Sequence, residues 1–229
     1  MPIKTYLTNE EIQKMIDQAE FLRDKVILTF YADTGCRVSE LLGIKVEHID
    51  LDNQVVLIPH LKRGIKKKCP ACHRVAGRNQ GFCSRCGSDL SSVQAEGLEE
   101  RNRLINIGDQ TCELLREFTK GLKPGDHLIT LSRQMVFYIV RAAAKSIGLV
   151  GKVILNPESG KSHFVHPHNF RDSLAVSWLT FAKDDPTKQK ALQEHLGHKS
   201  FVTTMKYHKL TPASVRKVSD EVRQLRFGK

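Results

Sequence analysis

The chain has 229 residues, with 36 Lys and Arg against 25 Asp and Glu, and a formal net charge of +11. No stretch approaches the roughly 18 apolar residues that a membrane span requires, and residues 1–11 lack the apolar segment of a secretory signal. Composition therefore excludes the membrane-spanning and secreted classes and predicts a cytoplasmic protein with one core of ordinary size. The basic balance favours an anionic partner, nucleic acid first.

The positive charge is concentrated in two segments. Residues 60–103 carry ten Lys or Arg and four Asp or Glu, and the last 24 residues carry seven and two. Residues 1–59, in contrast, have a net charge of −4. Basic surfaces also keep proteins soluble, but this concentration favours contact with a polyanion.

The first 60 residues follow a helical pattern. Thr8 and Glu11 form a capping box ahead of apolar residues on one helical face. A broader apolar helix covers residues 22–31 and stops at Thr34-Gly35, and a short third helix begins at Arg37.

The pattern then changes to strands and back to helices. Val55–Ile58 and Leu104–Ile107 are β-branched apolar runs that predict two strands of a small sheet, separated by some 45 residues. Further helices are expected after the caps Asp109, Ser132, Asp185 and Thr211. The sequence thus predicts an α+β, mainly α-helical protein.

Four cysteines lie between the two predicted strands. Cys69 and Cys72, then Cys83 and Cys86, form two C-x2-C pairs separated by ten residues. Two such turns complete a tetrahedral four-sulfur metal site, and so short a segment needs metal binding to fold. Disulfides are disfavoured in the cytoplasm, and zinc is favoured over iron for a closed structural site. We predict one structural zinc ion.

The role of this zinc ribbon has three interpretations. Basic residues flank it, including Lys66–Lys68, Arg101 and Arg103, which favours DNA contact. The ribbon could equally brace the strands or bind another protein. The remaining cysteines, Cys36 and Cys112, lie on apolar helical faces and are expected to be buried thiols.

Four further clusters contain polar residues that could take part in catalysis. They are Thr34-Gly35-Cys36-Arg37 with Ser39-Glu40-Leu41, His168 three residues before Arg171, Leu196-Gly197-His198, and Thr203-Thr204 just before Tyr207. Singly, each has an ordinary structural explanation: a solvated arginine, a capping histidine, a half-buried tyrosine.

Together and in this order, the clusters resemble the catalytic domain of the tyrosine recombinase (phage integrase, Xer-like) family. Arg37, His168, Arg171, His198 and Tyr207 match its motifs, with the tyrosine nine residues beyond the last histidine. The resemblance covers roughly residues 6–210 and implies an integrase-like fold. It implies a catalytic domain in residues 1–62 and 101–229, interrupted by the inserted ribbon segment 63–100.

The resemblance also implies that the usual N-terminal core-binding domain is missing here, so that the chain is either a minimal recombinase or a fragment. Residues 172–173 read Asp-Ser where many relatives have His-Thr. We interpret this departure as variation outside the catalytic set.

The implied activity is site-specific DNA recombination or integration through a 3′-phosphotyrosine on Tyr207, without ATP or a catalytic metal. Arg37 and Arg171 would hold the phosphate, His198 would donate to a phosphate oxygen, and His168 would orient the site or handle the tyrosine proton. Lys62 would be the general acid. Lys66, Lys67 and Lys68 are the alternatives for that role.

The expected partner is double-stranded DNA. The C-terminal apolar seam would dock on a neighbouring protomer of a tetramer on synapsed sites, or pack on its own domain; it consists of Val215, Val218, Val222 and Leu225. Two other functions stay open: a type IB topoisomerase-like relaxing enzyme, and a non-catalytic zinc-ribbon DNA-binding regulator.

Overall fold

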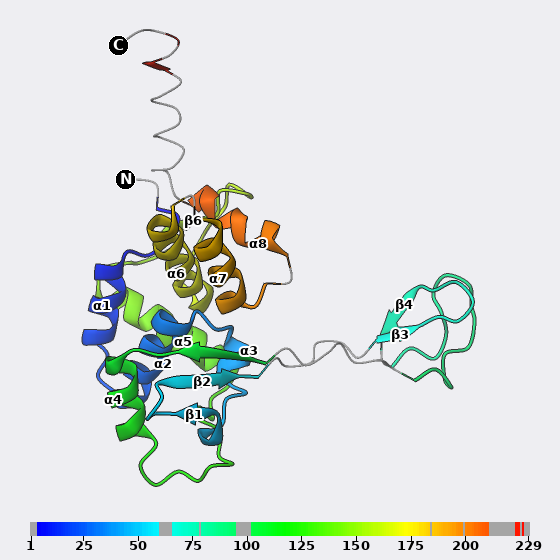
Figure 1. Ribbon diagram of the computed structural model, residues 1–229, viewed down its shortest axis with the longest axis horizontal. Helices are drawn as coiled ribbons and strands as arrows, with labels where there is room; N and C mark the ends of the chain where they lie inside the picture. The colour runs from blue at the N-terminus through cyan, green and yellow to red at the C-terminus, as the bar shows by residue number, and fades with distance from the viewer. Residues whose placement is uncertain are drawn as a thin grey trace. The chain divides into compact units, whose positions relative to one another are not determined.

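The structure, a computed structural model, describes residues 4–59, 66–77, 79–94, 102–183, 185–198, 200–210, 223, 224 and 226 (Figure 1). The chain divides into two compact units. Unit 1 consists of Met1–Ile58 and Arg103–Lys229, and unit 2 consists of Pro59–Asn102.

The first helices of unit 1 form as the sequence predicts. Helix α1 (Asn9–Asp17) begins at a capping box in which Thr8 Oγ1 accepts from Glu11 N–H and Glu11 Oε2 accepts from Thr8 N–H. Helix α2 (Leu22–Thr34) is buried over most of its surface and packs against α1 and two later helices, α4 (Asp109–Phe118) and α6 (Pro167–Ala182). The short helix α3 (Val38–Leu41) follows, with Arg37 as its N-cap residue.

Gly35 makes the tight connection between α2 and α3. Its φ of 57° lies in the left-handed region, and a Cβ atom there would come within 2.9 Å of a Leu174 methyl group. Glycine satisfies both requirements because it has no side chain. The turn therefore packs Gly35 closely against Leu174 and the backbone of Arg171.

The predicted strands pair in a three-stranded antiparallel sheet of order β1-β2-β5, preceded by the 3-10 turn η1 (Val46–His48). Its strands are β1 (Ile49–Asp50), β2 (Val55–Ile58) and β5 (Arg103–Asn106). The register pairs Val55 with Asn106 and Ile58 with Arg103. The second strand begins one residue earlier than the apolar run suggested, so Arg103 belongs to the sheet.

The remaining elements of unit 1 are mostly helices. They are α4 (Asp109–Phe118), α5 (Arg133–Ser146), β6 (Ile154–Leu155), β7 (Ser162–His163), α6 (Pro167–Ala182), α7 (Pro186–Leu196), α8 (Phe201–Met205) and the 3-10 helix η2 (Lys206–Leu210). Ser132 and Asp185 cap α5 and α7 as predicted. Gly108, and not Asp109, is the N-cap of α4. The predicted cap Thr211 lies outside the described residues.

Two apolar cores organise unit 1. The larger one joins α1, α2, α4, α5 and the three-stranded sheet. The smaller one joins α6, α7 and η2, which lie close together in Figure 1, and it includes Leu192, Leu196 and the ring of Tyr207. Tyr207 is therefore held in position by packing.

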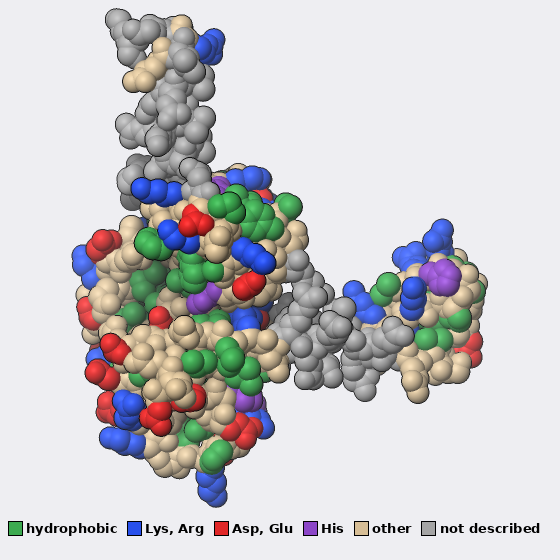
Figure 2. Space-filling model, viewed as in Figure 1, with side chains coloured by type: hydrophobic (Ala, Val, Ile, Leu, Met, Phe, Trp, Pro, Cys, Tyr) green, Lys and Arg blue, Asp and Glu red, His purple; other side chains and the backbone are tan. Residues whose placement is uncertain are grey.

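Unit 2 is a small ribbon with a core of its own. Strands β3 (Lys66–Lys68) and β4 (Val75–Gly77) pair antiparallel, with Lys67 opposite Ala76. The core consists of Cys69, Ala76, Cys83 and Leu90. Lys and Arg side chains lie on its exposed surface (Figure 2).

The fold confirms the predicted class, mainly helical with small antiparallel sheets. Cys36 and Cys112 are buried, as expected of core thiols. Within the ranges that the structure describes, every helix is too short or too polar to cross a membrane.

Candidate functional site

Arg37 begins the site at the turn between α2 and α3. Its backbone N–H and its Nη1 each donate to a different oxygen of Glu40, both at 2.8 Å. About a third of its side chain is exposed. Glu40 thus fixes the guanidinium while part of it still faces solvent.

Glu40 is held in turn by Arg103. Nη1 and Nη2 of Arg103 donate to the two carboxylate oxygens at 3.2 and 2.8 Å. Burial on its own would raise the pKa of Glu40, but the hydrogen bonds and charges of Arg103 and Arg37 outweigh it and lower the pKa to about 2. Sequence reasoning counted Arg103 among the basic residues that flank the ribbon; in the structure its side chain is 10% exposed and paired with Glu40.

Arg171 is fully buried in α6 and joins the C-terminal ends of two helices. Its Nη1 donates to the Gly35 carbonyl at 2.8 Å, and its Nη2 donates to the Leu196 carbonyl and, at 2.9 Å, to Nε2 of His198. Its buried Nε–H has no hydrogen-bond partner in the described part of the chain. The guanidinium is therefore preorganised, with donor capacity left over.

These contacts determine the tautomer of His198. Because Nε2 accepts from a guanidinium, the proton must lie on Nδ1, which donates to Thr204 Oγ1 at 2.9 Å. Burial and the positive charges of Arg171 and Arg37 lower the pKa of His198 to about 4. The imidazole is therefore neutral at pH 7.

Tyr207 lies on η2 against this imidazole. The two rings are nearly parallel, with centroids 5.8 Å apart. Burial raises the pKa of the phenol, while the charges of Arg171 and Arg37 oppose the rise. The structure thus brings the predicted residues Arg37, Arg171, His198 and Tyr207 together.

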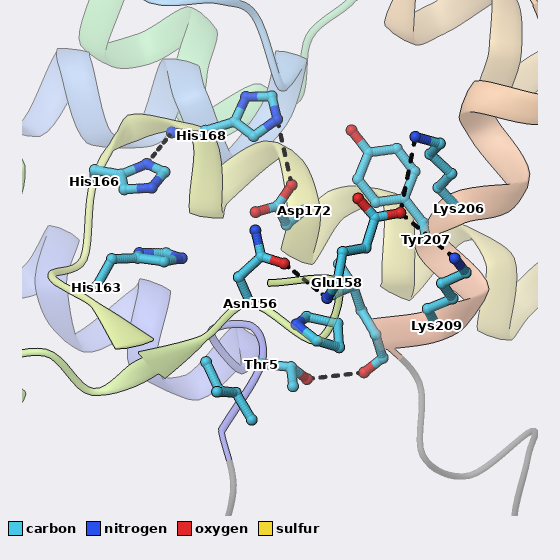
Figure 3. A pocket seen from close by; sticks show the side chains of 13 residues that line it. Thr5, Asn156, Glu158, His163, His166, His168, Asp172, Lys206, Tyr207 and Lys209 are labelled. Atoms are coloured by element: carbon cyan, nitrogen blue, oxygen red, sulfur yellow. Dashed lines mark hydrogen bonds and ion pairs between the residues drawn. The ribbon is translucent and has the colours of Figure 1, made fainter. Parts of the chain in front are cut away.

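His168, another predicted catalytic residue, lines a pocket beside Tyr207 (Figure 3). Desolvation and the charges of Arg171 and Arg37 lower the pKa of His168 to about 4, although about half of its side chain is exposed. The last predicted catalytic residue, Lys62, lies outside the described residues. Its alternatives Lys66–Lys68 form β3 of unit 2.

The pocket next to Tyr207 has a volume of about 270 Å³. His163 and His166 also line it, with stacked rings 4.6 Å apart. On another wall, Glu158 pairs with Lys206 and Lys209 at 3.8 and 3.5 Å. Sequence reasoning missed Glu158 because this residue lies in the β6–β7 hairpin, which the pattern did not predict.

Asp172 is a further residue that sequence reasoning missed. Its Oδ1 lies 3.6 Å from Nε2 of His168, and its Oδ2 accepts from Asn169 at 3.3 Å. Burial raises its pKa to about 7, against the effects of Asn169 and Arg171. The neighbouring Ser173 is structural, since its Oγ accepts from Leu7 N–H. The Asp-Ser departure in the sequence was the available signal.

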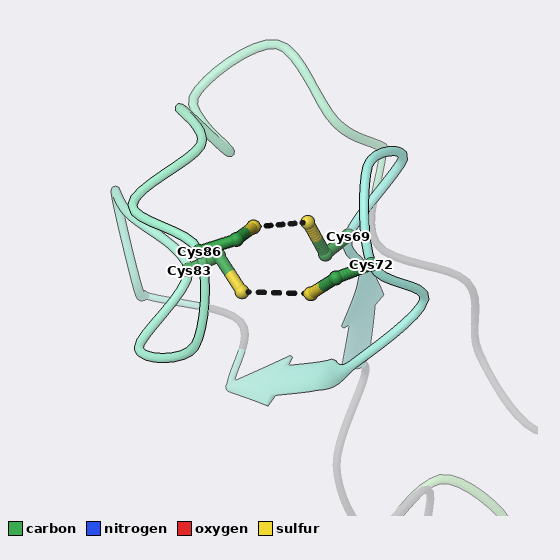
Figure 4. A group of neighbouring side chains, drawn as sticks. All are labelled: Cys69, Cys72, Cys83 and Cys86. Carbon is green, nitrogen blue, oxygen red and sulfur yellow. Dashed lines mark hydrogen bonds between the residues drawn. The ribbon is translucent and has the colours of Figure 1, made fainter.

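The four cysteines of unit 2 converge (Figure 4). Their sulfur atoms all lie within 4.8 Å of one another, and the pairs Cys69–Cys86 and Cys72–Cys83 are 3.5 Å apart. A tetrahedral zinc site with Zn–S bonds of about 2.3 Å needs sulfur atoms about 3.8 Å apart. Each C-x2-C turn is closed by a backbone hydrogen bond, from His73 to Cys69 and from Gly87 to Cys83. This cluster can bind a metal ion.

Comparisons with known proteins find a family model and recombinases that are similar to this chain. Residues 5–86 match the phage integrase family model. The tyrosine recombinase XerD of Bifidobacterium longum is 28% identical over 91% of this chain and 59% of its own length. XerA of Saccharolobus solfataricus is 25% identical over 90% of this chain and 52% of its own. The chain thus spans little more than half the length of these relatives.

Solved recombinase structures share the fold. The XerA recombinase superposes with a TM-score of 0.61 at 20% identity, covering 97% of this chain and 66% of the other. A post-cleavage complex of the XerH site-specific recombinase with its palindromic difH substrate gives 0.60 at 20% identity, covering 95% and 53%. The comparisons confirm the resemblance to the tyrosine recombinases and the integrase-like fold.

Proposed function

We propose that this chain is the catalytic domain of a tyrosine-type site-specific DNA recombinase or integrase. The observation that carries the proposal is the convergence of Arg171, His198 and Tyr207, with Arg37 beside them, in a chain that matches recombinases over nine-tenths of its length. Its substrate would be double-stranded DNA; the XerH structure is a complex with its palindromic difH substrate. The relaxing enzyme and the non-catalytic regulator are not favoured, since the matched relatives are named recombinases.

Tyr207 would be the nucleophile. Its oxygen would attack a DNA phosphate, form a 3′-phosphotyrosine and release a 5′-hydroxyl. A buried phenol loses its proton with difficulty, and the charges of Arg171 and Arg37 offset part of that cost. The covalent bond conserves the energy of the broken phosphodiester, so strand joining would need neither ATP nor a catalytic metal.

The two arginines would stabilise the phosphate in the transition state. Arg37 offers a guanidinium that is held by Glu40 and about a third exposed, and Arg171 offers the buried Nε–H that lacks a partner in the described part of the chain. For His198 to donate from Nε2 to a phosphate oxygen, the imidazole must either switch tautomer, with Thr204 Oγ1 donating to Nδ1, or gain a second proton. An adjacent phosphate favours the second proton because a nearby anion raises the pKa of an imidazole.

Two assignments rest on the resemblance alone. Lys62 would donate the proton to the leaving 5′-oxygen. The seam of Val215, Val218, Val222 and Leu225 would dock on a neighbouring protomer in a tetramer. All five residues lie outside the described part of the chain.

Unit 2 would hold a structural zinc ion through Cys69, Cys72, Cys83 and Cys86 and contact DNA. The sulfur spacing supports the metal. Charge supports the DNA contact, since its described residues carry five Lys or Arg and one Asp. The catalytic domain would comprise residues 1–62 and 101–229, with 63–100 as the insertion, an arrangement close to the two compact units.

A suicide substrate tests the activity. A duplex nicked just beyond the cleavage point loses its short 5′-hydroxyl fragment, so that the covalent protein–DNA adduct accumulates. We expect the native chain to form the adduct, Tyr207→Phe to bind DNA without forming it, and Tyr138→Phe, an exposed tyrosine on α5, to behave as native. Adducts in Tyr207→Phe would refute the assignment of the nucleophile.

The same assay separates the competing functions. A non-catalytic regulator would trap no adduct. A relaxing enzyme would trap one and relax supercoiled plasmid, whereas a recombinase would exchange strands between two paired sites. The target duplex can be selected by its binding to Tyr207→Phe.

A further inference from the structure

We propose that Asp172 accepts the proton of Tyr207 during DNA cleavage and that His168 positions its carboxylate. The inference rests on the proposed function. It goes beyond that function because Asp172, which departs from the family pattern, has no role in it. It starts from the wall of the pocket beside Tyr207, which Asp172, His168 and Tyr207 all line (Figure 3).

Two neighbours on the preceding turn of α6 lie against the carboxylate. His168 lies one helical turn before Asp172 on α6, with Nε2 at 3.6 Å from Oδ1, and Asn169 donates to Oδ2 at 3.3 Å. The Asp172 side chain is 15% exposed. It is close enough to Tyr207 for its negative charge to raise the pKa of the phenol.

The surroundings of the carboxylate suit a base. Arg171 and His168 are its charged or titratable neighbours on α6, and Tyr207 faces it from η2. Farther along the pocket wall, the charges of Glu158, Lys206 and Lys209 largely pair with one another, and His163 and His166 stack. Burial raises the pKa of Asp172 to about 7, and a general base works best when its pKa lies near the operating pH.

His168 is the less suitable base. Its pKa is lowered to about 4, so it binds a proton more weakly than Asp172. As a neutral imidazole with its proton on Nε2, it can instead donate toward Oδ1 of Asp172. This is a positioning role of the kind that a histidine and a carboxylate share in many active sites.

The step balances as follows. The oxygen of Tyr207 forms a bond to phosphorus, the bond between phosphorus and the 5′-oxygen breaks, and the tyrosine proton moves to Asp172. The leaving 5′-oxygen takes a proton from the general acid. In the joining step, Asp172 returns its proton to the departing tyrosine oxygen.

The test isolates the nucleophile with a DNA substrate that carries sulfur at the 5′-bridging position, where the leaving group needs no proton. With native protein, we expect the single-turnover cleavage rate to rise with pH through about 7 and then level off, as Asp172 loses its proton. Asp172→Asn keeps the size of the side chain and an oxygen that can accept from Asn169, but the amide cannot take up the tyrosine proton. This variant should cleave at least about tenfold more slowly and lose this inflection.

Three further variants separate a proton acceptor from a structural residue. Asp172→Glu should restore part of the rate together with an inflection. His168→Gln should keep the inflection but shift the pH at which it occurs, since the residue next to the Asp172 carboxylate is replaced. Glu158→Gln, which removes another carboxylate of the same pocket, should show the native dependence of cleavage rate on pH. DNA affinity should stay unchanged in all of these variants.

Two results would overturn the inference. One is an Asp172→Asn variant with the native rate and inflection. The other is loss of the inflection in His168→Gln while Asp172→Asn keeps it, which would make His168 the base. If native protein forms no adduct at any pH, the proposed function itself fails, and this outcome is distinct from both.

Discussion

Arg103 on β5 places two nitrogens on the two carboxylate oxygens of Glu40 on α3, although 63 residues separate them. Glu40 also holds Arg37, so one buried carboxylate joins the sheet to the turn that carries a predicted catalytic arginine. Arg103 packs against the turn before His198 as well, since a Cβ atom on Gly197 would lie 3.0 Å from its Nη1. This arginine therefore connects the sheet with two parts of the site.

Glu40→Gln should destabilise unit 1 and impair cleavage. Removing the charge leaves the guanidinium of Arg103 buried and without an anion, which costs roughly 3 kcal/mol of unfolding free energy. Urea denaturation measures the loss. The control is Glu47→Gln, which removes an exposed carboxylate paired with Lys45 and should change stability by less than about 0.5 kcal/mol.

The pH dependence of this difference gives a second check. Because the pKa of Glu40 is lowered from 4.5 to about 2 in the folded protein, its ionised form stabilises the fold above pH 4.5, and this contribution disappears as the pH falls toward 2. The stability gap between native protein and Glu40→Gln should therefore shrink over that range. A gap that is constant down to pH 2 would mean that Glu40 acts through packing.

Thr204→Val should slow cleavage by disorienting His198. The hydroxyl of Thr204 accepts the Nδ1 proton that leaves Nε2 facing Arg171, and second-neighbour contacts of this kind support catalytic geometry. We expect a loss of roughly tenfold or more in single-turnover rate, with DNA affinity unchanged. The adjacent Thr203→Val, at an exposed position, is the matched control. Equal cleavage rates for the two variants would show that Thr204 does not orient His198 for catalysis.

Local signals were predictable from the sequence, whereas long-range burial was not. The capping box of Thr8 and Glu11 and the cap at Ser132 involve partners within three residues, and the structure has both. Arg103 looked like one more surface cation because its partner Glu40 lies far away in the chain. The same holds for Asp172, whose burial depends on helices and a hairpin that meet only in the folded chain.

In the candidate site, too, the motifs could be predicted from the sequence and the long-range contacts could not. The resemblance to the tyrosine recombinase motifs identified Arg171, His198 and Tyr207, which the fold brings into contact. Spacing cannot reveal that Nε2 of His198 accepts from Arg171, or that the carbonyls of Gly35 and Leu196 hold that arginine. Those contacts depend on how α2, α6 and α7 pack.

Removing the metal should unfold unit 2 and spare unit 1. The core of unit 2 has few apolar side chains besides its cysteines, so metal binding would supply most of its folding energy, and Cys83→Ser would take away one of four ligands. Metal analysis of native protein purified without added zinc should give about one equivalent. Hydrogen exchange should show protection lost in unit 2 and kept in α2 and α6. Cys112→Ser controls for the loss of a thiol outside the cluster. Full protection of unit 2 in metal-free protein would contradict the assignment.

Unit 2 should contribute to the salt dependence of DNA binding. Lys66 and Lys68 are exposed on β3, whereas Lys67 between them donates to the Leu90 carbonyl. Replacing Lys66 and Lys68 by Gln should lower the slope of log affinity against log salt by up to about 1.8, or 0.9 per phosphate contact. The same change at the exposed Lys120 and Lys123 of unit 1 removes equal charge and should leave the slope as it is. Equal slopes for both double variants would argue against DNA contact through β3.

Lys62→Ala should cleave ordinary DNA slowly and DNA with a 5′-bridging sulfur nearly normally. Lys62 follows the end of β2 by four residues, and the resemblance gives this position the role of proton donor to the leaving 5′-oxygen. An alkoxide is a poor leaving group at neutral pH, so loss of the donor should cost roughly a hundredfold or more. A thiolate leaves without a proton, which should restore the rate.

The comparison with Arg37→Ala makes the assignment specific. Arg37 would stabilise charge on the non-bridging oxygens, which sulfur at the bridging position does not relieve, so this variant should stay slow on both substrates. If Lys62→Ala cleaves ordinary DNA at nearly the native rate, the donor is another residue, and Lys66, Lys67 and Lys68 are the next to replace. If Lys62→Ala is slow on both substrates, Lys62 binds DNA or the phosphate and does not deliver the proton.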